Sequence, residues 1–139
     1  RCEAALAEVL QQPRQRALLD AVRARAPLPV ECCDCSKRPG LEGTFARAFF
    51  SAPHLLDRDA AEEARVTLCA NRLASRAAIE EALTHELVHA YDHCVQRRDL
   101  ASPSGLACSE VRAARESECR GTFGGGALVD RLCMGAAGL

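Results

Sequence analysis

The segment 77–94 decides the fold of this chain, because it contains the sequence His85-Glu86-Leu87-Val88-His89. Two histidines four residues apart lie on the same face of an α-helix, so both imidazole rings can reach a single metal ion. A divalent ion held by histidine nitrogens lowers the pKa of a bound water toward neutrality. Glu86 stands beside the first histidine, where it can accept that water's proton. The pattern therefore predicts a zinc-dependent hydrolytic site.

The residues around this motif favour a helix over 76–94. Ser75 is suited to cap its N-terminus, and Glu80 and Glu81 lie where the helix dipole favours acidic groups. Apolar residues recur at spacings of three and four, namely at Ile79, Leu83, Leu87, Ala90, Tyr91 and Cys94. We expect the two histidines to lie beside this apolar stripe, not in it. The alternative is a chance match of the motif on the surface of a helix.

A catalytic zinc site usually has three protein ligands and one water, so a third ligand is needed. A third residue on the same straight helix would stand too far from the ion, and the glycine that allows a chain reversal in a His-x-x-Gly-x-x-His pattern is absent after His89. We favour Glu110, because a second helix over 106–117 can bring its carboxylate back to the first helix. As the alternative, Glu110 is a solvated acid. Asp92 suits a supporting role, in which it accepts a hydrogen bond from a ligand imidazole and fixes its tautomer.

Length and charge exclude several kinds of partner. The chain has 139 residues, enough for one domain, and a formal net charge of -1. This balance provides no field that attracts nucleic acid or anionic lipid. No apolar run approaches the roughly 20 residues that span a bilayer, so we expect any membrane association to be peripheral. Because residue 1 is not methionine, we expect a fragment or a processed form.

The nine cysteines are more than a reduced cytosolic enzyme usually carries, which indicates an oxidising compartment. The candidates for disulfides are Cys2, Cys32, Cys35, Cys69, Cys94, Cys108 and Cys119. Spacing alone does not assign their pairs. The alternative is a second, structural zinc at the C-x-x-C spacing of Cys32 and Cys35, although no other C-x-x-C pair is present.

The segment before the metal-binding helix predicts an α+β fold that is mostly helical. Residues 2–25 have helical periodicity that Pro13 must interrupt, which predicts two short helices or one kinked helix. Short strands are predicted at 40–45 and 65–69. We expect them to pair as a small antiparallel ribbon within 40–70.

The remaining segments carry weaker signals. Residues 46–64 indicate an inserted loop or a short helix, and His54 within them is better explained as a solvated residue than as a ligand. Residues 95–105 are polar and contain proline and glycine, so we expect a turn there. The glycine-rich tail 121–139 is expected to be poorly ordered or truncated.

These residues together resemble the mitochondrial inner-membrane metalloprotease family that processes an ATP synthase subunit and assists assembly of that complex. The similarity is close at 83–94 and 106–114, and it continues at 117–120 and 66–71 and in the cysteine pair at 32 and 35. A fainter match follows Pro13, so that about residues 2–120 are covered.

The resemblance implies a zincin-like domain over 1–120, in which His85 and His89 bind one zinc ion and Glu86 is catalytic. It implies a zinc metalloendopeptidase located peripherally on the intermembrane-space side of the mitochondrial inner membrane, where cysteines are oxidised during import. It further implies that the substrate is the N-terminal propeptide of a membrane-embedded ATP synthase subunit. The chain departs from the family pattern in a longer loop at 46–64 and in the segment after Cys119, which is not recognisable.

Two other hypotheses stay open. A non-catalytic assembly factor or chaperone would keep this fold and hold the membrane subunit on exposed apolar surface. A disulfide-stapled binding module would bind no metal. For the peptidase, a ribbon that contains residues 66–69 would align an extended substrate by strand addition.

Overall fold

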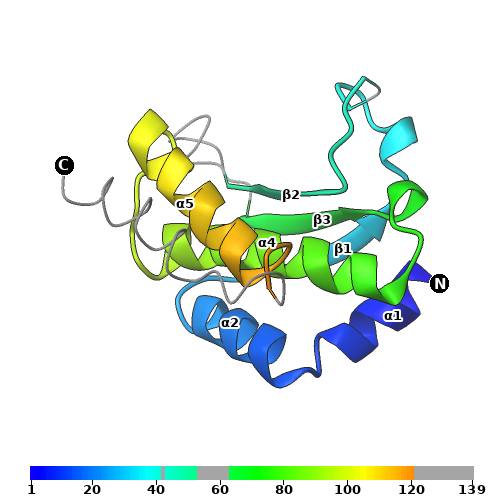
Figure 1. The fold of residues 1–139 in the computed structure, drawn as a ribbon, viewed down its shortest axis with the longest axis horizontal. Coiled ribbons are helices and arrows are strands. Elements are labelled where there is room, and N and C mark those ends of the chain that lie inside the picture. The colour runs from blue at the N-terminus through cyan, green and yellow to red at the C-terminus, as the bar shows by residue number, and fades with distance from the viewer. Residues whose placement is uncertain (42, 53–62, 121–139) are drawn as a thin grey trace.

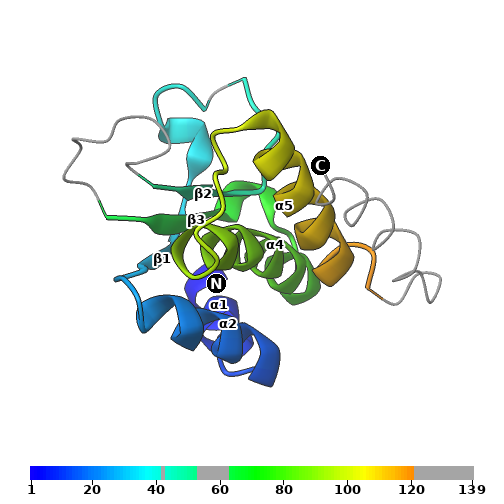
Figure 2. The same ribbon diagram turned by 90° about the vertical axis from the view of Figure 1, so that its left-hand side faces the viewer.

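The computed structural model describes residues 1–41, 43–52 and 63–120. They form an α+β fold with four α-helices and a three-stranded sheet (Figure 1). Helix α4 lies between the sheet and the pair α1 and α2, and α5 packs alongside it (Figure 2). No helix in this described part is long and apolar enough to cross a bilayer. The expectations for His54 and for the tail 121–139 concern residues outside the described part.

Helix α4 spans Arg76–Cys94, as predicted, and begins at the predicted cap, where Ser75 Oγ accepts a hydrogen bond from the Ala78 N–H at 3.1 Å. Helices and strands cover it on most sides, because α1, α2, α5, β2 and β3 all contact it. As expected, His89 lies beside the apolar stripe and not among the core residues, yet it is buried, with an exposure of 6%. The stripe did not predict this burial, because it marks only the side facing the main core, and α5 covers a second, polar side.

Pro13 separates two helices, α1 at Cys2–Val9 and α2 at Pro13–Arg23. This confirms the predicted interruption, since proline occupies the first turn of α2, where its missing N–H costs nothing. The two helices bury apolar side chains that join α4 in the core, among them Leu6, Val9, Leu19 and Val22. They hold α4 from the side opposite the sheet (Figure 2).

The sheet has the strand order β1-β3-β2, with β1 at Val30–Cys33, β2 at Ala48–Ser51 and β3 at Arg65–Cys69. Strand β3 is central. Its residue Val66 lies opposite Val30 in a parallel pair and opposite Phe50 in an antiparallel pair. β2 is at an edge of the described sheet, and its residues Ala48, Phe49 and Phe50 line a cavity together with residues of α4 and α5.

The strand predicted at 65–69 is confirmed as β3, but the strand predicted at 40–45 is wrong. Gly40 has a φ of 85°, and i to i+3 hydrogen bonds run from Leu41 N to Arg38 O and from Thr44 N to Leu41 O. None of the described residues at 40, 41 and 43–45 pairs with β3. The partner strand is β2, and the parallel strand β1 was missed, so the sheet is mixed and not a two-stranded ribbon.

Helix α5 spans Pro103–Glu116 and starts three residues before the predicted helix. Ser102 Oγ caps it by accepting the Gly105 N–H at 3.1 Å, and Pro103 occupies its first turn. The proline that we took for a turn marker is therefore a helix-start marker. A Cβ at Gly105 would lie 1.9 Å from the Asp99 carbonyl oxygen, so only glycine fits this close approach.

Disulfides join Cys2 to Cys32 and Cys35 to Cys69. The first disulfide connects α1 to β1. The second connects the 3₁₀ turn η1 (Cys35–Lys37) to the last residue of β3, and a further 3₁₀ turn, η2 (Ala70–Arg72), follows that strand. The alternative of a structural zinc at Cys32 and Cys35 is wrong, because each sulfur is bonded to a different partner. No disulfide between described residues includes the other candidates, Cys94, Cys108 and Cys119.

Removing the second disulfide with the double change Cys35→Ala and Cys69→Ala is expected to lower the free energy of unfolding by about 3 kcal/mol. The bond closes a loop across a sequence separation of 34. Without it, the unfolded chain gains conformational entropy, which favours unfolding. Urea denaturation followed by circular dichroism measures the loss. Cys33→Ala, which breaks no disulfide, is the control. Equal stability of the double variant and the wild type would contradict the expectation.

Candidate metal centre

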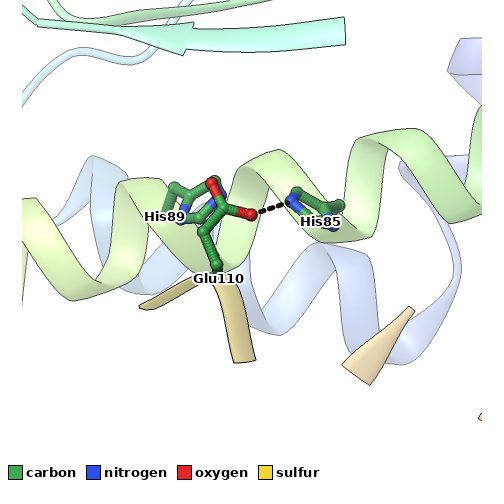
Figure 3. Close-up of side chains that lie close together, drawn as sticks. All are labelled: His85, His89 and Glu110. Carbon is green, nitrogen blue, oxygen red and sulfur yellow. Dashed lines mark hydrogen bonds and ion pairs between the residues drawn. The ribbon is translucent and has the colours of Figure 1, made fainter. Parts of the chain in front are cut away.

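Helices α4 and α5 bring together the side chains of His85, His89 and Glu110 (Figure 3). His85 Nε2 lies 3.1 Å from Glu110 Oε2, and His89 Nε2 lies 3.2 Å from Glu110 Oε1. The two imidazole rings come from successive turns of α4, with centroids 4.9 Å apart. One nitrogen or oxygen from each of the three residues lies within 4.8 Å of the others.

The spacing of these three donors can be tested against zinc. A tetrahedral zinc ion with bonds near 2.0 Å keeps its ligand atoms about 3.3 Å apart. The nitrogen-to-oxygen distances of 3.1 and 3.2 Å, one to each oxygen of Glu110, are close to that value, and with one donor atom per residue all three lie within 4.8 Å of one another. Two histidines and a glutamate also form a donor set that catalytic zinc sites use, with the fourth position left for water. The residues therefore fit a single zinc ion.

The other ring nitrogens of both histidines also have partners. His85 Nδ1 lies 2.9 Å from Glu118 Oε1, and His89 Nδ1 lies 2.7 Å from Ser109 Oγ. Ser109 in turn donates to Asp92 Oδ2 at 2.8 Å. Asp92 thus reaches the ligand imidazole through a serine hydroxyl, whereas we expected a direct hydrogen bond. Sequence reasoning missed Ser109 and Glu118, although Ser109 directly precedes a candidate ligand and both residues lie in segments of the family resemblance, at 106–114 and 117–120.

Asp92 is buried and receives a guanidinium as well as this hydroxyl. Arg112 donates to Asp92 Oδ2 from Nη2 at 2.7 Å and from Nε at 3.0 Å. Only 4% of the Asp92 side chain and 16% of the Arg112 side chain are exposed. A charged pair with additional hydrogen bonds is the form in which proteins tolerate buried ions. The pair therefore links α4 to α5 directly behind His89.

Glu86 is buried on the side of α4 that faces β2. Its Oε2 accepts the Phe50 N–H at 2.7 Å. Burial raises the pKa of Glu86 to about 7, and the negative charges of Glu110 and Glu118 oppose its ionisation further, although the charge of His85 and the Phe50 hydrogen bond favour it. A carboxyl group with a pKa near neutrality can both accept and return a proton.

The two candidate histidines are shifted in opposite directions. Burial lowers the pKa of His89, and the charge of His85 adds to this effect. Burial also acts against the charged ring of His85, but the hydrogen bond and the charge of Glu118, with Glu86 and Glu110, outweigh it, so the pKa of His85 is raised. The acidic groups around His85 thus favour positive charge at this point, and a metal cation would meet the same field.

A cavity of about 260 Å³ opens beside His89 and Glu110. Its wall combines the edge strand with both helices and the loop between them: Ala48, Phe49, Phe50, Glu86, His89, Leu100, Leu106 and Glu110. The Phe50 N–H points to Glu86 and away from β3, so the outer edge of β2 faces this cavity. Residues 66–69 are paired on both sides, so a further strand cannot add to them directly, and the sheet that contains them offers the edge of β2 instead. In the described sheet, β2 provides the edge beside the cavity to which a peptide can add.

Comparison with known proteins shows the family to which the chain belongs. The model of the peptidase M76 family matches residues 1–123, and the chain belongs to this family. The resemblance seen in the sequence at 83–94 and 106–114 is therefore confirmed.

Its relatives include proteins named mitochondrial inner membrane protease ATP23. The one from Mycosarcoma maydis is 35% identical over 94 residues, which are 68% of this chain and 38% of the relative. The one from Sclerotinia sclerotiorum is 44% identical over 96 residues, 67% of this chain and 35% of the relative. The homolog from Homo sapiens is 43% identical over 58 residues, 41% and 24% of the two chains. The chain thus spans well under half the length of these curated relatives. No solved structure matches significantly.

Proposed function

We propose that this protein is a zinc metalloendopeptidase with a zincin-like fold. The convergence of His85, His89 and Glu110 on one point carries the proposal, because their donor atoms have the spacing of zinc ligands. Glu86 lies within the same motif and borders the same cavity. Membership of the peptidase M76 family supports the reaction class.

The location and substrate are part of the same proposal. Relatives named mitochondrial inner membrane protease ATP23 support a site of action at that membrane. We propose peripheral association on the intermembrane-space side, with the N-terminal propeptide of a membrane-embedded ATP synthase subunit as substrate. The two disulfides are in keeping with an oxidising compartment of this kind.

The proposed mechanism gives each side chain one task. Zinc, when bound by His85, His89 and Glu110, supplies Lewis-acid chemistry that acidifies water and polarises the scissile carbonyl. Glu86 removes a proton from the attacking water and then delivers it to the leaving amine. Its side chain is mostly buried and borders the cavity beside His89 and Glu110, which places it to act in both steps.

The edge of β2 is the proposed binding site for the peptide backbone. A substrate that adds to this edge as a further strand passes directly beside Glu86, since Phe50 connects the strand to that carboxylate. Leu106 on α5 lines the cavity with 44% of its surface exposed, so it offers an apolar contact to a substrate side chain.

Elemental analysis of the purified protein tests the metal site. We expect about one zinc ion per wild-type chain and almost none in His89→Ala or Glu110→Ala, because two protein ligands hold zinc far more weakly than three. Glu3→Ala removes an exposed acid from α1 and should leave the zinc content unchanged. A wild-type protein without zinc, or a His89→Ala variant that retains it, would contradict the proposal.

A further inference from the structure

The chain from Ser109 to Glu118 contacts both candidate ligand histidines at both of their ring nitrogens. Glu110 faces the two Nε2 atoms at 3.1 and 3.2 Å. Ser109 contacts Nδ1 of His89, and Glu118, just past the end of α5, contacts Nδ1 of His85. One short segment therefore supplies the candidate ligand Glu110 and also contacts the Nδ1 atoms of the two candidate ligand histidines.

The hydrogen bonds around Ser109 define which nitrogen of His89 carries the proton. Asp92 beside Arg112 is a carboxylate with acceptor atoms only, so the single hydroxyl proton of Ser109 goes to Asp92. The Ser109 oxygen is then left to accept, and the Nδ1–H of His89 donates to it at 2.7 Å. With Nδ1 protonated, a neutral His89 keeps its lone pair on Nε2, the nitrogen that faces Glu110 and that a zinc ion between the two residues would use.

The surroundings of Ser109 hold this arrangement in place. Its exposure is 0%, and both of its partners are buried: His89 has an exposure of 6% and Asp92 of 3%. Arg112 fixes Asp92 through Nε and Nη2. A buried hydroxyl between two fixed partners has one satisfactory orientation.

Glu118 has the corresponding place beside His85. Its carboxylate oxygen Oε1 lies 2.9 Å from His85 Nδ1, and the Ser117 hydroxyl also contacts this carboxylate. A carboxylate can only accept, so His85 Nδ1 donates to Glu118; Nε2 faces the Glu110 carboxylate, and it would give up any proton it carries when zinc binds between them. Such contacts orient the rings of metal ligands and increase their basicity.

We propose that Ser109 and Glu118 are positioning residues, which hold His89 and His85 as Nδ1–H tautomers with both Nε2 lone pairs directed to the zinc position. This inference rests on the proposed zinc site. It assigns a role to two residues that bind no metal themselves, and it explains why the ligand Glu110 and both positioning groups come from one short segment.

The zinc affinity of variants, measured by competition with a chromophoric chelator, tests the proposal. Ser109→Ala and Glu118→Ala are each expected to lose affinity by about 10-fold to 100-fold. Ser104→Ala changes an exposed serine on the same helix, and Glu116→Ala removes the same charge two residues from Glu118; both should stay within about threefold of the wild type. If Ser109→Ala does not fold, Ser109→Cys keeps the buried shape with a weak hydrogen-bonding group and should show the loss.

A spectroscopic signature separates positioning from general support of the fold. In zinc-loaded protein with ¹⁵N-labelled histidine, NMR should show slowly exchanging Nδ1–H protons and zinc at Nε2 for both His85 and His89. The Nδ1–H signal of His89 should be lost in Ser109→Ala alone, and that of His85 in Glu118→Ala alone.

The possible outcomes are distinct. Wild-type protein that binds no zinc overturns the proposed function. Wild-type protein that binds zinc, with variants of equal affinity or with either histidine coordinated through Nδ1, overturns only the present inference. A loss confined to one variant overturns the role of the other residue.

Discussion

Replacing Glu86 with glutamine is expected to reduce the rate of peptide cleavage by about 10³-fold while the zinc content stays at one ion per chain. Glutamine has the same shape, and its amide oxygen can still accept the Phe50 N–H that now bonds to Glu86 at 2.7 Å. It cannot accept a proton from water, so the general-base step is lost. Single-turnover cleavage of a peptide spanning the propeptide processing site, with elemental analysis of the same sample, measures both quantities.

Glu81→Gln is the matched control, because it makes the same change on α4 at a carboxylate that contacts Arg47 at 2.5 Å. Its cleavage rate should equal that of the wild type. Wild-type cleavage by zinc-loaded Glu86→Gln would refute the role of Glu86. Assembly of the ATP synthase that persists without cleavage would assign assembly to a separate activity of the same fold.

The sequence predicted α4 well because its signals are local. The serine cap, the three-and-four spacing and the histidine pair all lie within about 20 residues, and nearest neighbours along a helix fix their relative positions. The sheet was predicted poorly. β1 and β2 have only four residues each and pair with the central strand β3, so their extended form depends on that strand, and for β1 also on the disulfide at Cys32, more than on their own composition.

The residues of the candidate site show the same difference between local signals and contacts made by distant segments. Glu110 was selected because a third ligand was chemically required and a second helix was available to supply it. Ser109 and Glu118 could not be selected in this way, since nothing in their neighbours shows that a ring nitrogen lies within 3 Å. Their contacts depend on how α5 rotates against α4. That rotation is fixed by buried contacts between the helices, including the ion pair of Asp92 with Arg112.

This ion pair leads to the second large effect: Asp92→Ala is expected to lower the free energy of unfolding by about 4 kcal/mol. The change leaves a mostly buried guanidinium without the carboxylate that accepts two of its N–H groups, and it removes the acceptor of the Ser109 hydroxyl. Urea denaturation in the presence of a chelator isolates this loss from any contribution of bound metal.

Asp20→Ala is the control for this measurement. Asp20 also faces an arginine, but its side chain is 67% exposed and lies 3.8 Å from Arg16, so solvent screens the pair and its loss should cost less than about 1 kcal/mol. The two variants should differ greatly in the free energy of unfolding that they lose. Burial accounts for this difference, since both aspartates face a guanidinium. If the two variants unfold at the same urea concentration, the Asp92–Arg112 pair does not hold α5 against α4, and another contact must orient Ser109 toward His89.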